Sequence, residues 1–331
     1  MPAYIVSSGS YVPSRVVSNL DLEPLLGLTA DQIFRSCGIK ERRWAAEDES
    51  ASSMGTNALA AAIGQSGLSP AEIDLLIVGT MSPDYSVPGT APIIQAKLGL
   101  SSIPTLDIRC ACCNFLYGIQ VAAAMIESRR ANLVALVFPE LQSRFLDRSP
   151  QAANLSMLFG DGASAVLVSS VPSGPALEIS DVVLFSDGSH ATDLGVAYPG
   201  SAGAWGKDTS DAKTYPRMSG QQVILSASRG LVEASRKLLE RNSLTVADVN
   251  WVVPHQANSN LLSQFARTMG IDPSKTILTI QEFGNTSSAS IGLTLDVLAK
   301  SGNISRNDRI LIPAFAAGFT WGAGLLRAGA A

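Results

Sequence analysis

The chain has 331 residues, of which 46% are hydrophobic, so it can bury a large core as two subdomains or one duplicated domain. Its net charge is −4 and no run of Lys or Arg exceeds two, so nucleic acid is not an expected partner. The amino terminus lacks a basic leader followed by an apolar core, and the uncharged stretch 310–326 contains Pro313 and three glycines. Neither a secretory signal nor a membrane span is therefore expected.

Helical and strand patterns alternate along the chain, which favours an α/β protein with buried sheets. The first half shows helices at 54–66 and 115–128 and strands at 75–79, 133–138 and 163–168. The second half shows helices at 222–242, 258–269 and 286–301 and strands at 251–253, 309–312 and 321–326. The repeated order predicts two duplicated halves, 1–170 and 171–331. Residues 201–216, rich in Gly, Ser, Asp and Lys, predict a surface excursion or lid.

Several common functional motifs are missing from the sequence. No dinucleotide GxGxxG, P-loop, GxSxG elbow or zinc-type Cys/His spacing occurs, so neither a cofactor nor a metal is expected. The four cysteines, three of them within four positions, cannot make a disulfide framework for a chain of this size. They predict a reducing, cytoplasmic environment.

A nucleophilic cysteine is the first functional candidate. Residues 105–113 form a short extended run that ends in cysteines and leads directly into the predicted helix 115–128. A helix N-terminus carries partial positive charge and unpaired N–H groups, so a thiol at this place should ionise below the usual pKa of about 8.5. For an isolated cysteine, a buried and unreactive thiol is the favoured interpretation, so Cys112 alone does not establish a nucleophile.

Two further residues fit cysteine acyl-transfer chemistry. His255, one of only two histidines, follows the predicted strand 251–253, and Asn285 precedes the predicted helix 286–301. Acyl transfer needs a thiolate, an imidazole and a neutral donor that steadies developing negative charge. A buried core histidine and a helix-capping Asn are the structural alternatives for these two residues. His190 is expected to be a loop histidine without a catalytic role.

Six motifs occur in an order that characterises one enzyme family: Gly38-Ile-Lys-Glu-Arg42, 107–118 around the cysteines, Phe159-Gly-Asp-Gly-Ala163, Val253-Pro-His-Gln-Ala-Asn258, Gly284-Asn-Thr-Ser-Ser-Ala289 and Gly318-Phe-Thr-Trp-Gly322. With them the whole chain resembles β-ketoacyl-acyl carrier protein synthase III, the initiating condensing enzyme of the thiolase superfamily. The resemblance implies a thiolase-like α/β fold, in which two duplicated βαβαβαββ halves form a five-layered α-β-α-β-α core. It also implies a homodimer.

The resemblance assigns roles to individual residues. Cys112 matches the nucleophile, which leaves Cys110 and Cys113 as neighbours. The acyl donor would be an acyl-CoA or an acyl-acyl carrier protein, and the second substrate would be a malonyl-acyl carrier protein. His255 and Asn285 would donate hydrogen bonds to the second thioester as it decarboxylates.

An oxyanion hole is also implied, made by the backbone N–H groups of Cys112 and Ala317. The family usually has glycines where this chain has Ala316 and Ala317. Alanine is compatible with this role if its φ stays negative.

The departures from the family concern substrate delivery. Gln32 and Ser36 stand where typical members bind the adenine of coenzyme A with Trp and Arg, and Ala153 stands where a second Arg flanks the nucleotide. Leu225 and Asn260 replace basic residues that help to dock the carrier protein, and Asn258 also falls at this entrance. The basic residues that remain available for coenzyme A are Arg148, Lys207 and Lys213.

The acyl pocket departs in size. Val87 falls where many relatives place a bulkier Phe that reaches the partner's pocket, and Phe159 is the other expected pocket residue. The smaller side chain at position 87 predicts room for a longer or aromatic acyl group.

The leading hypothesis is a decarboxylative Claisen condensation through acyl-Cys112. The alternative is an acyltransferase on the same scaffold that passes the acyl group to an oxygen or nitrogen acceptor. Short motifs around Arg109 and at 215–220 are similar to those of secondary-metabolism members of the family, which favours a specialised role. A third hypothesis, a catalytically silent subunit of a heterodimer, is disfavoured because Cys112, His255 and Asn285 are all present.

Overall fold

The computed structural model describes residues 1–196 and 216–329. The predicted lid at 201–216 falls outside this part of the chain except for Pro216, and so do Lys207 and Lys213. Within the described residues, no helix has both the length and the apolar character needed to cross a bilayer.

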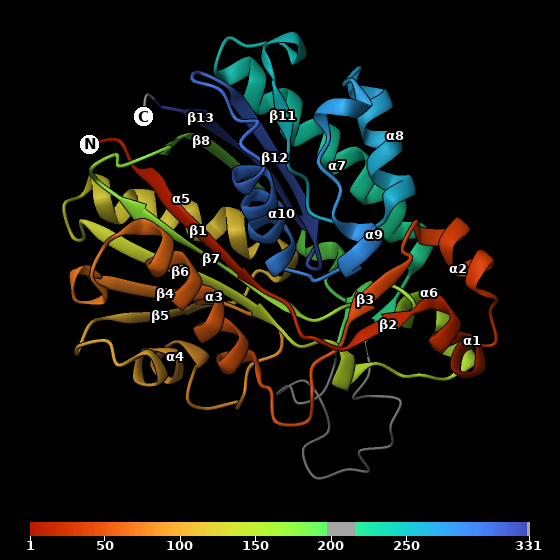
Figure 1. Ribbon diagram of the computed structural model, residues 1–331. Coiled ribbons are helices and arrows are strands. Elements are labelled where there is room, and N and C mark those ends of the chain that lie inside the picture. The colour runs from red at the N-terminus through yellow and green to blue at the C-terminus, as the bar shows by residue number, and fades with distance from the viewer. Residues whose placement is uncertain (197–215, 330–331) are drawn as a thin grey trace.

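Nine strands form one continuous sheet in the order β11-β12-β13-β8-β1-β7-β6-β4-β5 (Figure 1). The first half of the chain contributes β1 (Tyr4–Tyr11), β4 (Leu75–Gly79), β5 (Thr105–Ile108), β6 (Leu133–Glu140) and β7 (Gly162–Ser169). The second half contributes β8 (Leu177–Ser186), β11 (Trp251–Val252), β12 (Arg309–Ala316) and β13 (Thr320–Ala328). The halves join through β1 and β8, which pair at Tyr4–Glu178 and Ile5–Leu177.

The strand order repeats outward from this junction. β1, β7 and β6 are antiparallel neighbours, followed by β4 and β5 in parallel. β8, β13 and β12 are likewise antiparallel, followed by β11 in parallel and then by a single parallel bridge between Val252 and Thr276. The predicted duplication is therefore visible in the topology, and the boundary proposed near residue 170 lies in the connection between β7 and β8.

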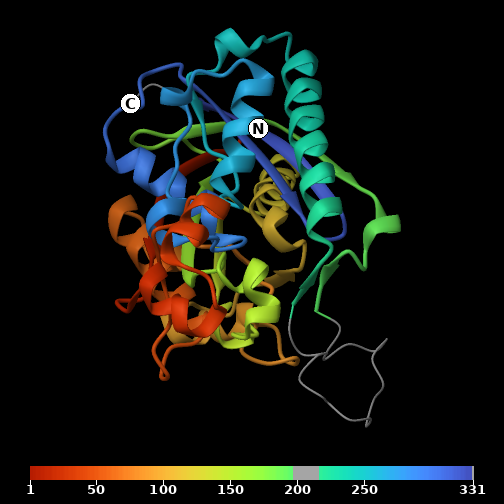
Figure 2. The same cartoon turned by 90° about the vertical axis from the view of Figure 1, so that its right-hand side faces the viewer.

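Helices cover both outer faces and fill the space between the halves. α3 (Ala51–Ser66) and α4 (Thr90–Leu98) pack on the outer face of the first half. α7 (Gly220–Arg241) and α8 (Ser259–Met269) pack on the outer face of the second half, where α7 runs along the strands as the long teal helix of Figure 2. α5 (Asn114–Glu127) and α10 (Ala289–Lys300) lie in the central core with strands of both halves. The predicted five layers are confirmed.

The two central helices form because their sequences are apolar on nearly every side. On α5 the residues Phe115, Ile119, Ala122 and Ile126 recur at helical spacing and are all fully buried. Burying each large side chain of this kind stabilises the fold by about 1.5 to 3 kcal/mol. This packing fixes the amino-terminal end of α5, where Cys112 lies.

Smaller elements surround one end of the central helices. They are β2 (Val16–Ser18), β3 (Glu41–Arg43), α1 (Asn19–Leu26), α2 (Ala30–Cys37), α6 (Ala153–Ser156), α9 (Ile280–Phe283), β9 (Leu194–Gly195) and β10 (Arg217–Met218). Arg42 is fully buried among them and donates to Asn19 Oδ1 at 2.8 Å and to the Met157 carbonyl at 2.7 Å. These bonds tie the amino-terminal segment to the chain that connects α6 with β7.

The helix predicted at 286–301 starts later than expected. The helix expected from Thr286 begins at Ala289, because residues 284–288 form a turn in which Gly284 and Ser287 have positive φ, 66° and 49°. Residues in the left-handed region do not continue a right-handed helix. The turn instead carries several of the side chains described next.

Candidate active site

Cys112, His255 and Asn285 line one cavity of about 270 Å³. It lies between the smaller elements α2, α6, β9 and β10, the amino-terminal half of α7 and the end of β12. Most of its wall is apolar, with Val223, Leu231 and Phe315 among the lining side chains. Among the described residues no Asp, Glu, Lys or Arg lines it. The three candidate catalytic side chains therefore share a space that carries no fixed charge from the described part of the chain.

Cys112 lies in a single 3₁₀ turn, Ala111–Cys113, between β5 and α5. Ala111 has φ 48°, which is uncommon for a residue with a side chain. The side chain of Asn114, fully buried at the start of α5, accepts a hydrogen bond from the Cys110 N–H at 2.6 Å. The strained turn is thus held by the first residue of the helix that follows it.

The ionisation of Cys112 differs from the prediction. Burial raises the pKa of the Cys112 thiol to about 12, while a hydrogen bond with Ser287 acts in the opposite direction and the nearby buried Glu140 raises it further. The expected lowering by the helix N-terminus was wrong for the resting site, because loss of solvation outweighs it. Near pH 7 the Cys112 thiol therefore keeps its proton.

His255 follows β11 and is held on two sides. Its backbone N–H donates to the Pro313 carbonyl at 3.0 Å, and its Nδ1 lies 2.8 Å from Ser290 Oγ. The Ser290 hydroxyl accepts from the Gln256 N–H at 3.3 Å, and its own proton has no acceptor other than Nδ1 among the described residues. We therefore assign the hydroxyl as donor to Nδ1, which leaves the ring proton on Nε2. Burial lowers the pKa of His255 to about 4, so the imidazole is neutral near pH 7.

Asn285 is fixed by its backbone and its side chain. Its N–H donates to the Leu158 carbonyl at 2.8 Å, and its carbonyl accepts from the Gly160 N–H at 3.1 Å. Its Oδ1 accepts from the Ser287 N–H at 2.9 Å, which leaves the Nδ2 group as a donor. The alternative in which Asn285 caps the next helix was wrong, because α10 begins after Ser288.

Two serines, one in this turn and one at the start of α10, were not singled out from the sequence. Ser287 Oγ lies 3.5 Å from Cys112 Sγ, and Ser290 Oγ contacts the His255 ring. The sequence shows only that both serines lie in the motif 284–290. This motif contains another serine whose contacts are structural, so their position in it did not identify them. This other serine, Ser288, bonds to Glu140 Oε1 at 2.6 Å and to the Gly79 carbonyl at 3.2 Å.

Of the two residues predicted to form the oxyanion hole, Cys112 lines the cavity, and Ala317 lies next to a residue that lines it. Ala316, the last residue of β12, lines the cavity, and Ala317 follows it. Neither alanine is among the described residues with positive φ. Their backbones therefore meet the condition under which alanine can replace glycine here, and the donor roles of the Cys112 and Ala317 N–H groups stay a prediction.

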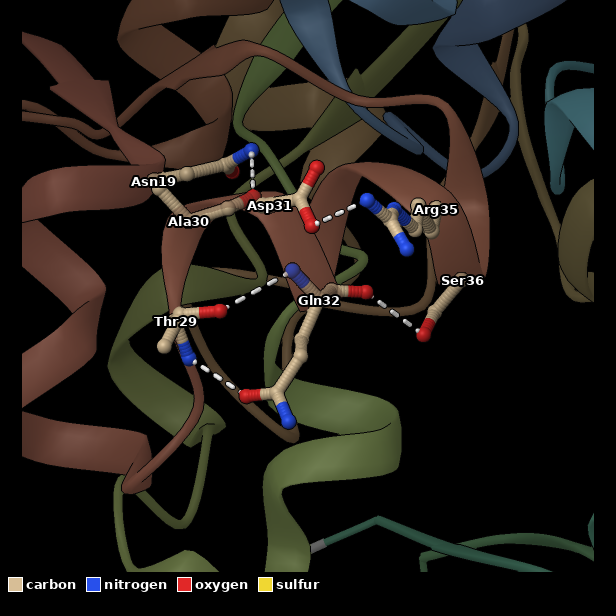
Figure 3. A network of polar contacts seen from close by, with 7 residues as sticks. All are labelled: Asn19, Thr29, Ala30, Asp31, Gln32, Arg35 and Ser36. Carbon is tan, nitrogen blue, oxygen red and sulfur yellow. Dashed lines mark hydrogen bonds and ion pairs between the residues drawn. The ribbon is translucent and has the colours of Figure 1, made fainter.

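Of the residues predicted at the substrate entrance and acyl pocket, Ser36, Phe159 and Asn258 line the cavity. Gln32 is exposed and closes a capping box at the start of α2 with Thr29, with bonds of 3.2 and 2.8 Å (Figure 3). The Ser36 hydroxyl donates to the Gln32 carbonyl at 2.8 Å (Figure 3). Both side chains are thus bonded within α2.

The two asparagines at the start of α8 connect this helix to α2. Asn258 Nδ2 donates to the Ser36 carbonyl at 3.0 Å, and Asn260 Nδ2 donates to the carbonyls of Arg35 at 2.9 Å and Ser36 at 3.2 Å. The end of α2 also lies close to α8 at Gly38, where an added Cβ would overlap the side chain of Ser259. Asn260 therefore has a structural contact where the family resemblance implies a basic docking residue.

The remaining predicted residues lie outside the cavity wall. The Arg148 guanidinium lies 4.6 Å from the Trp44 ring centroid and donates to the Ser143 carbonyl at 3.1 Å. Ala153 is buried in α6, Leu225 is 48% exposed on α7, and Val87 is 86% exposed. Their roles in coenzyme A, carrier or acyl binding stay predictions.

Comparison with known proteins gives matches in both halves of the chain. Residues 106–188 match the family described as 3-oxoacyl-[acyl-carrier-protein] synthase III, and residues 239–328 match the family of its C-terminal part. The β-ketoacyl-[acyl-carrier-protein] synthase III of Chlamydia caviae is 37% identical over 98% of this chain and 96% of its own length.

Solved structures are similar over the same extent. The 3-oxoacyl-[acyl-carrier-protein] synthase III of Aquifex aeolicus superposes with a TM-score of 0.89 at 34% identity, over 98% of this chain and 99% of its own. The priming β-ketosynthase of the R1128 polyketide pathway does so with a TM-score of 0.89 at 31% identity, over 99% of this chain and 96% of its own. The chain therefore belongs to the β-ketoacyl-acyl carrier protein synthase III family of condensing enzymes.

Proposed function

We propose that this chain catalyses a decarboxylative condensation in which Cys112 carries the acyl group. The observation that carries the proposal is the convergence of Cys112, His255 and Asn285 on one largely apolar cavity. A thiol, a neutral imidazole and an amide donor are the groups that this chemistry requires.

In the first half-reaction, the Cys112 sulfur attacks the carbonyl of an acyl thioester. The bond from that carbonyl to the donor sulfur breaks, and the proton lost by Cys112 ends on the departing thiol. One thioester replaces another, so no further reagent is consumed. The N–H groups of Cys112 and Ala317 would stabilise the oxyanion of the tetrahedral intermediate.

In the second half-reaction, a malonyl thioester loses carbon dioxide, and its enolate carbon attacks the acyl-Cys112 carbonyl. The bond to Cys112 breaks, and the thiolate takes up a proton from solvent. His255 through Nε2–H and Asn285 through Nδ2–H would donate to the enolate oxygen. Burial holds the pKa of His255 at about 4, so the ring is neutral near pH 7. A neutral imidazole can donate from Nε2–H to the enolate oxygen without carrying charge itself.

The proposed substrates are an acyl-CoA or acyl-acyl carrier protein as donor and a malonyl-acyl carrier protein as extender. Both kinds of donor present the acyl group on a pantetheine arm, which has neutral amides and hydroxyls. The neutral side chains of Ser36, Asn154 and Asn258 in the cavity wall are compatible with such an arm.

We also propose a homodimer that works in the cytoplasm. β5 is an edge strand with Leu106 40% exposed, and the neighbouring loop exposes Val87 and Tyr85. An uncovered edge strand with apolar neighbours favours pairing with a second copy. Light scattering on the purified chain tests this directly, with a mass of one subunit as the contrary result.

The experiment for the proposed reaction follows carbon dioxide and product together. The chain is incubated with a panel of acyl thioesters on coenzyme A or carrier protein, followed by ¹⁴C-carboxyl-labelled malonyl-acyl carrier protein. Release of label with formation of a β-ketoacyl product supports condensation. Acylation of an alcohol or amine without release of label would contradict it and favour acyl transfer to oxygen or nitrogen.

A further inference from the structure

The turn that precedes α10 places a hydroxyl against the candidate nucleophile. Ser287 Oγ lies 3.5 Å from Cys112 Sγ, within the range of a hydrogen bond to sulfur. Ser287 is only 3% exposed, and its hydroxyl has no other hydrogen-bond partner among the residues that the structure describes. A buried hydroxyl directed at one sulfur atom is an unusual use of a polar group, because such groups normally bond to backbone or water.

The backbone of Ser287 is strained in a way that keeps the hydroxyl at this place. Its φ is 49°, in the left-handed region that residues with side chains seldom occupy. Its N–H donates to Asn285 Oδ1 at 2.9 Å, so the same residue also orients the Asn285 amide. Glycine would adopt this backbone without a steric penalty. Strain at a position that holds a polar group against a reactive atom points to a functional use of the side chain.

We propose that Ser287 is a further catalytic residue, whose hydroxyl donates a hydrogen bond to the Cys112 thiolate and so favours the form of the sulfur that attacks the thioester. The inference rests on the proposed role of Cys112 as nucleophile. In the resting thiol either atom is able to donate, whereas in the thiolate only the hydroxyl has a proton to give. The bond therefore strengthens as the proton leaves, because hydrogen bonds to charged acceptors are shorter and stronger.

The surroundings of the sulfur explain why such a donor is needed. No described cationic side chain lines the cavity, and the imidazole nearby is neutral, so no fixed positive charge in the described part of the chain offsets the thiolate. Burial and the buried Glu140 both raise the pKa of Cys112, while the bond to Ser287 is the largest influence that lowers it. Ser287 and the start of α5 are the features that act in favour of ionisation.

Two substitutions separate the hydroxyl from the backbone. Ser287→Ala removes the hydroxyl and keeps the strain, and Ser287→Gly removes the hydroxyl and relieves the strain. Loss of one hydrogen bond to an ionised group corresponds to an upward shift of the thiol pKa by about one unit. Below that pKa the rate of alkylation follows the thiolate fraction, so both variants should react about tenfold more slowly than the wild type.

The measurement is the rate of iodoacetamide alkylation of Cys112 between pH 7 and 9.5, with the modified sulfur located by fragment-ion mass spectrometry. The full chain is used, and circular dichroism and thermal unfolding check that each variant is folded. We expect about a tenfold fall in both variants at every pH of this range. Decarboxylation of malonyl thioester by enzyme already acylated on Cys112 should fall much less in Ser287→Gly than alkylation does.

A matched control is Ser288→Ala, which removes a neighbouring hydroxyl that bonds to Glu140 and to the Gly79 carbonyl and does not contact Cys112. This variant should not show the tenfold fall, because loss of the bond raises the pKa of Glu140, and a neutral Glu140 no longer opposes ionisation of Cys112. Unchanged alkylation rates in both folded Ser287 variants would overturn the assignment of Ser287 and leave the proposed function intact. A wild-type chain in which no acyl thioester acylates Cys112 would instead overturn the proposed function, and the assignment of Ser287 with it.

Discussion

His255 Nδ1 lies 2.8 Å from the hydroxyl of Ser290, the second residue of α10. Through this contact, α10 sets the orientation of the His255 ring, which lies 35 residues earlier in the chain. A ring held at Nδ1 presents Nε2 to the cavity, which is the atom that the proposed mechanism uses.

Ser290 should therefore act on the second half-reaction through His255. In Ser290→Ala the ring loses the partner that fixes its orientation and tautomer, and we expect about a tenfold slower condensation, on the scale of one net hydrogen bond. The measurement is single-turnover release of carbon dioxide from pre-acylated enzyme, with the KM for the malonyl substrate determined alongside. Ser290→Thr keeps the hydroxyl and should recover most of the rate, whereas equal rates in all three proteins would exclude a positioning role.

Asn285 should be required for the enolate and not for the acyl-enzyme. Asn285→Asp keeps an oxygen for the Ser287 N–H but loses the amide donor, and removal of such a donor typically costs about 10²-fold or more in rate. Starting from enzyme already acylated on Cys112 removes any effect of the new carboxylate on the thiol. We expect carbon dioxide release to fall by that factor, and a rate within about twofold of wild type would contradict the role.

His255 gives the stability of the fold a defined pH dependence. Burial lowers its pKa from 6.5 to about 4, so between these values the unfolded chain binds a proton that the folded chain does not. This group therefore destabilises the fold as the pH falls from about 6.5 to 4, by about 3 kcal/mol at the lower limit. Urea unfolding of wild type and His255→Gln at a series of pH values should show their difference in unfolding free energy shrinking over this window. A difference that stays constant from pH 7 to 4 would show that the ring is not buried as a neutral group.

Packing of α10 against β7 should be sensitive to one methyl group. A Cβ at Gly292 would lie 2.8 Å from Ser164 Cβ and overlap the buried Ser164 hydroxyl. We expect Gly292→Ala to lower the unfolding free energy by about 1 to 3 kcal/mol, measured by urea denaturation. Adding Ser164→Gly opens the space that the methyl group needs, so the double variant should be more stable than the sum of the single effects. Simple additivity would argue against this contact.

Much of the fold could be predicted because its central elements have strong patterns. The buried residues of α5 recur at helical spacing, and β4 and β6 are continuous apolar runs, so their types and approximate ends were right. The start of α10 was predicted too early because Asn285 is a residue type that often caps the start of a helix. The left-handed residue Ser287 lies in a turn that long-range contacts hold in place. The backbone of Asn285 bonds to Leu158 and Gly160, the Ser287 hydroxyl contacts Cys112, and no local sequence pattern reports these contacts.

The three candidate catalytic side chains could be identified from their motifs, but their protonation could not. The pKa of Cys112 depends on how completely the cavity excludes water, and this is a property of the assembled layers. The same limit applies to Ser287 and Ser290, because serine is common in turns and only the folded chain shows which hydroxyl faces the sulfur or the ring. Asn260 was predicted at a carrier-docking position, but in the folded chain its side chain bonds to the backbone of α2.

The central claim is that Cys112 is the residue that accepts the acyl group. Its most direct test is intact-protein and fragment-ion mass spectrometry after incubation with a panel of acyl thioesters, applied to wild type, Cys112→Ala and the neighbouring Cys110→Ala. We predict a mass gain of one acyl group in wild type and Cys110→Ala, located on Cys112, and none in Cys112→Ala. An acyl group that persists in Cys112→Ala, or that is located on Cys110 or Cys113 in the wild type, would contradict the account.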